Sequence, residues 1–362
     1  MKKVLAFALT AMTLAACQPN SYTIHGSIQK EDADVKWVYL YPLGEEEPVD
    51  SALVQDGLFQ MKGQQDKAAL YSLRPEMTKM RRVNAGLDFP YTATFVLENA
   101  ELDICLNQVS TVKGTPANDA RTAFQGGISS LYDEMMEVYH SEKEQSEIMK
   151  EADALQEKIN ALAKAYLEDN KGDLNALYTL YQFRYNLPED FQMPFYENVE
   201  ETYGEQPWLA QQLKHIEARK AVAVGNPFLD FKMNDLEGNE HALSEWVGNG
   251  KVAVIDFWAS WCPPCRADMP NMVNIYQKYK DQGFELIGIS LDSEKEKWEN
   301  GIEKLNITWP QLSDLKGWKN AGAQLYGVNS IPSTVLVDKD GKIVAHNLHG
   351  EELEAEIEKL LK

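Results

Sequence analysis

The sequence contains few of the residues that staple small exported domains or bind metals. Only four cysteines and six histidines occur among its 362 residues, too few for a fold held together by disulfides. The longest apolar run, residues 4–16, is too short to cross a bilayer as a helix. Basic residues number 35 against 56 acidic ones, a net charge of −21. Such a surface repels nucleic acid, so no nucleic-acid partner is expected.

The first residues have the pattern of an export signal. Lys2 and Lys3 precede the apolar run, which ends in Leu14-Ala15-Ala16-Cys17. This pattern predicts a signal peptide over residues 1–16. The ending resembles the lipobox of bacterial lipoproteins, which implies a lipid anchor on Cys17 and a place in the cell envelope, facing the periplasm or at the outer membrane. The alternative is ordinary cleavage beside an incidental cysteine.

Residues 17–115 are expected to form a β-rich domain. Alternating apolar and polar residues begin at Tyr22, and Asp56-Gly57 between two apolar runs is a strong hairpin signal. A second hairpin is predicted from residues 92–97 and 102–106.

Residues 116–222 have a helical period instead. Leu155, Ile159 and Tyr166 share one helix face, and Asp173 can cap a helix that begins at Leu174. We expect this region to be a helical linker. The β-rich domain and the linker together would act as a spacer, a dimerisation surface or a partner selector.

From residue 223 to residue 362 the pattern alternates between strand and helix. This order indicates a mixed sheet with helices on both faces. The expected elements are a hairpin over 228–241, strands at 251–258, 284–291, 333–338 and 342–347, and helices at 264–281, 294–305, 317–326 and 351–361.

The chemistry is concentrated where the strand over 251–258 meets the following helix, at Cys262-Pro263-Pro264-Cys265. Two thiols one helical turn apart can open and close a disulfide or bind a metal. Zinc requires four ligands, and here one cysteine pair has no histidine close to it in sequence. No metal site is therefore predicted. A peroxidase would have one isolated cysteine rather than a pair.

The segment from Asp256 to Arg266 resembles the active-site junction of TlpA/ResA-like exported reductases in the thioredoxin superfamily. The resemblance implies a thioredoxin-like α/β fold for residues 223–362 and thiol–disulfide oxidoreductase activity, with no cofactor beyond the Cys262–Cys265 disulfide. Residues 50–63 and 95–98 resemble a β-rich domain that is often fused in front of such lipoproteins.

The position of each cysteine suggests its role. We expect Cys262 to be exposed at a helix N-terminus, where unpaired N–H groups favour a thiolate, and to attack a partner disulfide. Cys265 would then resolve the mixed disulfide. Neither proline has an N–H group, so neither can stabilise the thiolate. Pro264 disfavours helical geometry at Pro263, so the helix is expected to begin at Pro264, with the Cys265 and Arg266 amides nearest the sulfur.

Two further residues complete the predicted catalytic set. Asp256 ends a buried strand, so desolvation should raise its pKa, and the resemblance implies that it accepts the proton of Cys265. Ile331-Pro332 resembles the cis-proline segment that faces the dithiol and leaves the Ile331 backbone free to pair with an extended substrate. The predicted substrate contacts are Trp261, Pro263, Pro264 and Ile331.

These features together predict an envelope-tethered reductase of disulfides in exported proteins, which a membrane thiol donor must reset. Two alternatives stay open. The same dithiol could work as an oxidase or isomerase, because direction depends on redox potential. The chain could also be a surface binding lipoprotein that uses the thioredoxin fold as a platform.

Overall fold

The computed structural model describes residues 20–28, 35–76 and 88–362. The predicted signal peptide and Cys17 lie outside these ranges, so both stay predictions. The chain forms two compact units, and the boundary between them lies between Leu209 and Ala210. The finer boundaries predicted after residues 115 and 222 stay predictions. None of the helices in the described ranges is both long enough and apolar enough to cross a membrane.

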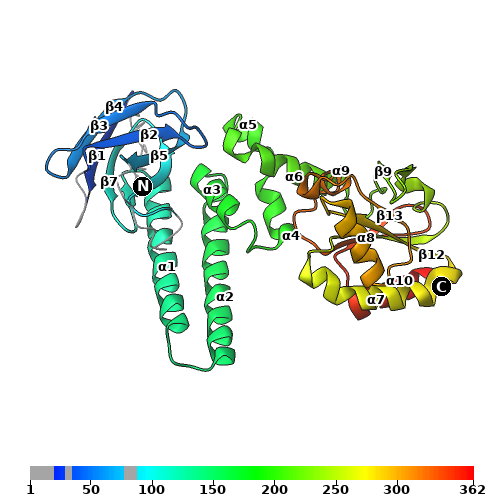
Figure 1. Cartoon of the computed structure of the whole chain (residues 1–362). Helices are drawn as coiled ribbons and strands as arrows, with labels where there is room; N and C mark the ends of the chain where they lie inside the picture. The colour runs from blue at the N-terminus through cyan, green and yellow to red at the C-terminus, as the bar shows by residue number, and fades with distance from the viewer. Residues whose placement is uncertain (1–19, 29–34, 77–87) are drawn as a thin grey trace, which may run out of the picture. The chain divides into compact units, whose positions relative to one another are not determined.

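The first unit contains two four-stranded sheets (Figure 1). Their strand orders are β4-β1-β7-β8 and β3-β2-β5-β6. Buried side chains from both sheets, among them Ile24, Leu40 and Leu102, form one core, so the sheets pack face to face. The strands are β1 (Tyr22–Ile28), β2 (Trp37–Pro42), β3 (Asp50–Leu53), β4 (Leu58–Gly63), β5 (Ala69–Pro75), β6 (Ala93–Leu97), β7 (Glu101–Leu106) and β8 (Thr111–Lys113).

The two predicted hairpins of this unit have different outcomes. Asp56 and Gly57 both have positive φ, and Gln55 and Leu58 exchange backbone hydrogen bonds across them, so the tight turn is as predicted. The strands on either side then diverge, because β3 pairs with β2 and β4 pairs with β1. The second predicted hairpin is wrong. β6 pairs with β5, whereas β7 pairs in parallel with β1, so the chain changes sheets between them.

The rest of this unit is helical. α1 and α2 lie side by side and are joined by a short loop (Figure 1). Leu155, Ile159 and Tyr166 are buried on α2, as their spacing predicts. The side chain of Asp173 accepts a hydrogen bond of 2.6 Å from the Asn175 amide and caps α3. The helices are α1 (Pro116–Tyr139), α2 (Gln145–Asp169), α3 (Leu174–Gln182), α4 (Glu189–Gln192) and α5 (Val199–Tyr203), with 3₁₀ turns η1 (Met193–Phe195) and η2 (Pro207–Leu209).

The second unit is built on a five-stranded sheet of order β13-β12-β11-β14-β15. β11, β12 and β13 run parallel, and β14 and β15 are antiparallel. A short hairpin of β9 and β10 lies outside this sheet. The strands are β9 (Lys232–Asn234), β10 (Glu240–Ala242), β11 (Val252–Trp258), β12 (Phe284–Ser290), β13 (Gln311–Leu312), β14 (Ser333–Val337) and β15 (Ile343–His346).

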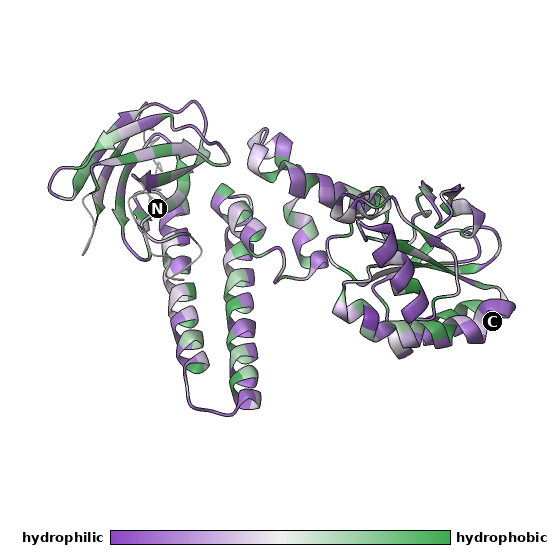
Figure 2. Cartoon of the chain, viewed as in Figure 1, coloured by the Kyte–Doolittle hydropathy of each residue, from purple (hydrophilic) through white to green (hydrophobic). Residues whose placement is uncertain are grey.

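Helices surround this sheet (Figure 1). They are α6 (Ala210–Ala221), α7 (Pro263–Tyr279), α8 (Lys295–Lys304), α9 (Ala321–Leu325) and α10 (Gly350–Leu361), with 3₁₀ turns η3 (Leu243–Glu245), η4 (Lys280–Gln282) and η5 (Gly317–Lys319). Every residue of β11 and β12 is buried. The sheet strands are mainly hydrophobic and the surrounding helices carry many hydrophilic residues (Figure 2), as expected for strands covered on both faces. The thioredoxin-like mixed sheet is therefore confirmed.

Candidate functional site

Asp256 is the one acidic residue within the buried strand β11. It lies between Gly288 of β12 and Thr334 of β14, and its side chain is 3% exposed. Burial raises the pKa of Asp256 to about 7, with the charge of Asp268 adding to this shift and His349 opposing it. The predicted direction of the shift is confirmed, and its cause is desolvation of the carboxylate.

The dithiol lies where the chain passes from β11 into α7. Cys262 and Cys265 form a disulfide, with their Cα atoms 5.3 Å apart. Cys262 is the N-cap of α7 in an extended conformation, and the Cys265 amide donates a hydrogen bond of 3.2 Å to its Sγ. This arrangement gives one of the free N–H groups of the helix N-terminus directly to the sulfur.

The helix begins one residue earlier than predicted, at Pro263 rather than Pro264. Both prolines fit in the first turn, because its N–H groups have no partner within the helix. The Arg266 amide consequently bonds to the Cys262 carbonyl oxygen at 3.1 Å and not to the sulfur. The Cys265 amide alone therefore stabilises the Cys262 sulfur from this turn.

The expected exposure of Cys262 is wrong for the disulfide form. Cys262 is 3% exposed and Cys265 is 2% exposed. The cause is a segment distant in sequence, since the Cys262 Sγ lies 3.6 Å from the carbonyl oxygen of Ile331. The residues that flank the two cysteines, Trp261, Pro263, Pro264 and Arg266, are instead exposed.

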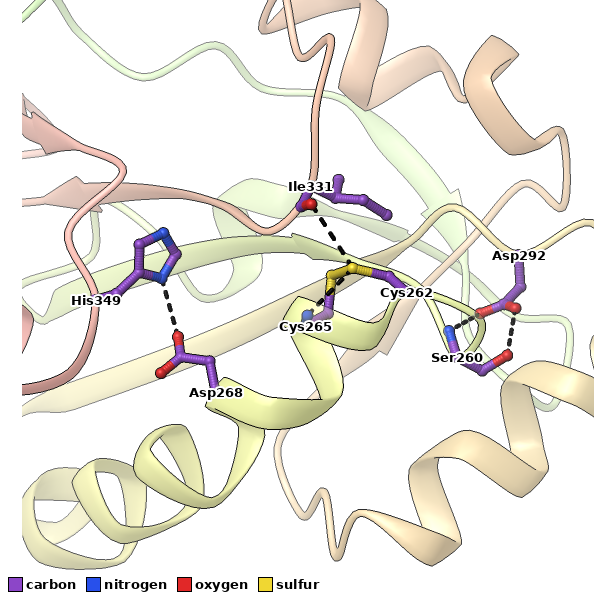
Figure 3. The surroundings of a disulfide bond; sticks show 7 residues. All are labelled: Ser260, Cys262, Cys265, Asp268, Asp292, Ile331 and His349. Atoms are coloured by element: carbon purple, nitrogen blue, oxygen red, sulfur yellow. Dashed lines mark hydrogen bonds and ion pairs between the residues drawn. A yellow bond between two sulfur atoms is a disulfide. The ribbon is translucent and has the colours of Figure 1, made fainter. Parts of the chain in front are cut away.

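The Ile331 segment faces the disulfide (Figure 3). The peptide bond between Ile331 and Pro332 is cis, and both residues are partly buried. A disulfide sulfur has no hydrogen to donate, so its contact with the Ile331 oxygen is a close approach. A Cys262 thiol at the same place could donate to that oxygen. The structure thus brings together Cys262, Cys265, Ile331 and Pro332.

Sequence reasoning missed an ion pair between α7 and the residue that caps α10. Asp268, three residues after Cys265, accepts a hydrogen bond of 2.9 Å from Nδ1 of His349 (Figure 3). This bond lowers the pKa of Asp268 and raises that of His349. The one-turn spacing of Asp268 from Cys265 was visible in the sequence. His349, at the N-cap of α10, had no local signal.

A second missed residue is Asp292, a carboxylate that is 1% exposed just after β12. It accepts hydrogen bonds from the Ser260 amide at 3.0 Å and from the Ser260 hydroxyl at 2.7 Å (Figure 3). The Ser290 hydroxyl donates a further bond of 2.8 Å. These bonds tie the loop that precedes Cys262 to the end of β12.

No group of three or more histidine, cysteine or acidic side chains is placed to hold a metal ion in the part of the chain that the structure describes. The arrangement can instead cycle between a dithiol and a disulfide. It has a sulfur at a helix N-terminus, a second sulfur within bonding reach, and a buried carboxyl group whose pKa lies near neutrality.

Comparisons with known proteins agree with this chemistry. Residues 224–346 match the AhpC/TSA family, and residues 22–120 match a domain of unknown function, DUF4369. The thiol-disulfide oxidoreductase ResA of Geobacillus thermodenitrificans is 37% identical over 125 residues, which are 34% of this chain and 69% of that protein. ResA of Bacillus anthracis is 34% identical over 144 residues, 40% of this chain and 80% of that protein.

The chain is also similar to solved structures. The thioredoxin domain of a thiol-disulfide oxidoreductase from Bacteroides vulgatus is 33% identical, with 39% of this chain and 99% of that chain covered and a TM-score of 0.36. A thiol:disulfide interchange protein from a Bacteroides species is 32% identical, with 39% and 91% covered and a TM-score of 0.36.

Proposed function

Because this chain belongs to the ResA family of thiol-disulfide oxidoreductases, we propose that it works as a reductase of disulfides in exported proteins. The observation that carries the proposal is the Cys262–Cys265 pair at the start of α7, together with the buried Asp256 on β11, the strand that leads into this helix. The weak stabilisation of the reduced cysteine pair supports reduction rather than oxidation of the substrate. The sequence of the first 17 residues supports a location in the cell envelope.

The reductive cycle uses only the two cysteines and one base. The Cys262 thiolate attacks a substrate disulfide, which forms a mixed disulfide and releases one substrate sulfur as a thiolate. Asp256 accepts the proton of Cys265, whose thiolate attacks the Cys262 sulfur and releases the second substrate sulfur. Two electrons pass from the two cysteines to the substrate. Asp256 passes the Cys265 proton to a released sulfur, and solvent returns to the other the proton that Cys262 lost when it became a thiolate. The protein is left with the Cys262–Cys265 disulfide.

The expected redox potential of the two cysteines supports reduction of the substrate. A dithiol becomes a strong oxidant when its reduced, thiolate form is well stabilised. Here the Cys262 sulfur receives one hydrogen bond from the first turn of α7, at Cys265, because the two preceding helix positions are prolines. Both sulfurs are also nearly fully buried, which disfavours a thiolate. We expect a potential near the about −270 mV of thioredoxin rather than the about −120 mV of a strong oxidant.

Equilibration with glutathione buffers of known ratio measures this potential directly. A value close to that of strong oxidants would overturn the reductase direction and favour an oxidase or isomerase.

The activity itself is tested by reduction of a disulfide-bridged peptide. Cys262→Ser should abolish turnover, whereas Cys105→Ser, which removes a free cysteine on β7, should retain it. Equal rates for the Cys262→Ser variant and the unaltered protein would falsify the assignment. A binding lipoprotein would be indicated if cells needed residues 21–220 but tolerated the loss of both Cys262 and Cys265.

We also propose that Cys17 anchors the protein by lipid to the cell envelope. The basic start, the short apolar run and Leu14-Ala15-Ala16-Cys17 support this. The anchor would hold the dithiol near a membrane thiol donor that resets it after each cycle. Cys17→Ala should move the protein from the membrane fraction to the soluble fraction, and persistence in the membrane fraction would contradict the anchor.

A further inference from the structure

Two tryptophans form a partly exposed aromatic pair beside the dithiol. Trp261 directly precedes Cys262, and Trp318 lies on the 3₁₀ turn η5. They are 47% and 48% exposed, and their ring centroids are 6.3 Å apart in a tilted arrangement. Leaving half of two large aromatic side chains in water forgoes much apolar burial. Exposed aromatic groups of this kind are typical of contact surfaces.

The loop that carries Trp318 is held against the end of β12. The Ser290 carbonyl oxygen accepts hydrogen bonds from the Ser313 hydroxyl at 2.9 Å and from the Asn320 side chain at 3.3 Å. Asp314 accepts bonds from the Lys316 and Ala321 amides, at 3.2 and 3.0 Å. Trp318 therefore lies on a loop that is fixed at both ends.

The same serine links this loop to Trp261. The Ser290 hydroxyl donates to Asp292, which in turn holds the amide and the hydroxyl of Ser260. Asp292 and Ser290 are buried, at 1% and 0% exposed. One buried polar network thus supports both tryptophans, and such support keeps a binding surface in place before its ligand arrives.

We propose that Trp318, with Trp261, binds an apolar or aromatic side chain next to the reactive cysteine of the substrate. The inference rests on the proposed reductase function and names its substrate class. Any disulfide that reaches the Cys262 sulfur passes one residue from Trp261, and Pro263 and Pro264, which follow Cys262 and are exposed, are also apolar.

The test compares two disulfide-bridged peptides that differ only in Phe or Ser beside each cysteine. The full chain should reduce the Phe peptide with a kcat/KM about tenfold higher, mainly through a lower KM, since aromatic contact and burial together contribute about 1.4 kcal/mol. Trp318→Ala should bring the Phe-to-Ser ratio close to one, and Trp318→Phe should keep most of the preference. Leu325→Ala removes an exposed apolar side chain outside the pair and should leave the ratio unchanged.

The outcomes separate this inference from the proposed function. A Trp318→Ala variant that retains the full Phe-to-Ser ratio would overturn the aromatic site while leaving the reductase intact. Equal loss of activity on both peptides would also overturn it, because Trp318 would then act on the fold rather than on specificity. If the unaltered protein reduced neither peptide, the reductase function itself would fail.

Discussion

Asp256 links the buried strand to the pH dependence of the reaction. In the proposed cycle its carboxyl group must be ionised to accept the Cys265 proton, and its pKa of about 7 places that ionisation near neutrality. We predict that the rate of peptide reduction by the unaltered protein rises with pH through about 7, in addition to the rise caused by thiol ionisation at higher pH.

Asp256→Asn should remove the rise in rate near pH 7 and leave the rise that thiol ionisation causes at higher pH. The variant should react on the order of 10²-fold more slowly, the usual contribution of a placed general base. Single-turnover rates measured from about pH 5 to pH 9 check this. A rise that persists near pH 7 in the variant would assign the titration to another group.

The raised pKa of Asp256 also makes the stability of the folded protein depend on pH. The carboxyl group holds its proton more tightly in the folded state, because its pKa rises from 3.8 to about 7. Stability is therefore lost as pH increases from about 4 to about 7, by on the order of 4 kcal/mol. Asp256→Asn should thus be more stable than the unaltered protein in mildly alkaline solution and equal to it in acid.

Among the single residues of the site, those whose role depends on spacing along the chain could be predicted from the sequence. Cys262, Cys265 and Asp256 all lie within one short segment. The burial of Cys262 could not be predicted from spacing, because the covering group, Ile331, is distant in sequence and only the family resemblance indicated that its segment faces the dithiol. Asp292 and His349 were missed for the same reason: their partners Ser260 and Asp268 lie in other elements.

The first turn of α7 sets how many hydrogen bonds the Cys262 thiolate can receive. Pro264→Ala would add an N–H group at the second helix position, which can point at the N-cap side chain. One added bond of about 1 kcal/mol should raise the redox potential by about 20 mV. Pro270→Ala, in the same helix but beyond its first turn, serves as the control and should leave the potential unchanged.

The ion pair between Asp268 and His349 connects α7 to the start of α10. The raised pKa of His349 means that its contribution is lost as pH rises through that pKa, and the lowered pKa of Asp268 means that it is also lost in acid. His349→Gln should therefore destabilise this unit by about 1 kcal/mol near pH 6. The difference should shrink in alkaline solution. Hydrogen exchange of the β11 amides at several pH values measures it, and a difference independent of pH would contradict the ion pair.

Elements with a long period or a strong turn signal were predicted well. β11, β12 and α7 differ from their expected ranges by a few residues at most. The two-residue strand β13 was missed because it is too short for any periodicity. The incorrect prediction of a hairpin between β6 and β7 has a different cause. Adjacent strands with a plausible turn can belong to different sheets when each finds its partner elsewhere.

At the scale of the whole molecule, the oxidoreductase chemistry belongs to one unit. The second unit has its own hydrophobic core and contains all of the described site residues, from Asp256 to His349. Residues 210–362 should therefore fold alone and reduce a small peptide at a rate within about twofold of the full chain. Circular dichroism and the peptide assay check this. A fragment that does not fold would show that the first unit is required.

Charge and composition predicted properties of the whole chain but not the role of its first unit. The net charge of −21 argues against nucleic acid, and the β-rich and helical regions were both expected. Neither the sheet pairing of the first unit nor the single division of the chain by contacts at Leu209 could be predicted from the sequence, because both depend on contacts between distant segments.

Capture of the mixed disulfide tests the central claim most directly. Reduced full-length Cys265→Ala is mixed with a disulfide-bridged peptide, and adducts are located by mass spectrometry of proteolytic fragments. The account predicts one peptide bound per chain, on Cys262, which persists because no resolving thiol follows. The matched Cys262→Ala variant should form little adduct. Equal adducts on both variants, or none on Cys265→Ala, would contradict the assignment of Cys262 as the attacking thiol.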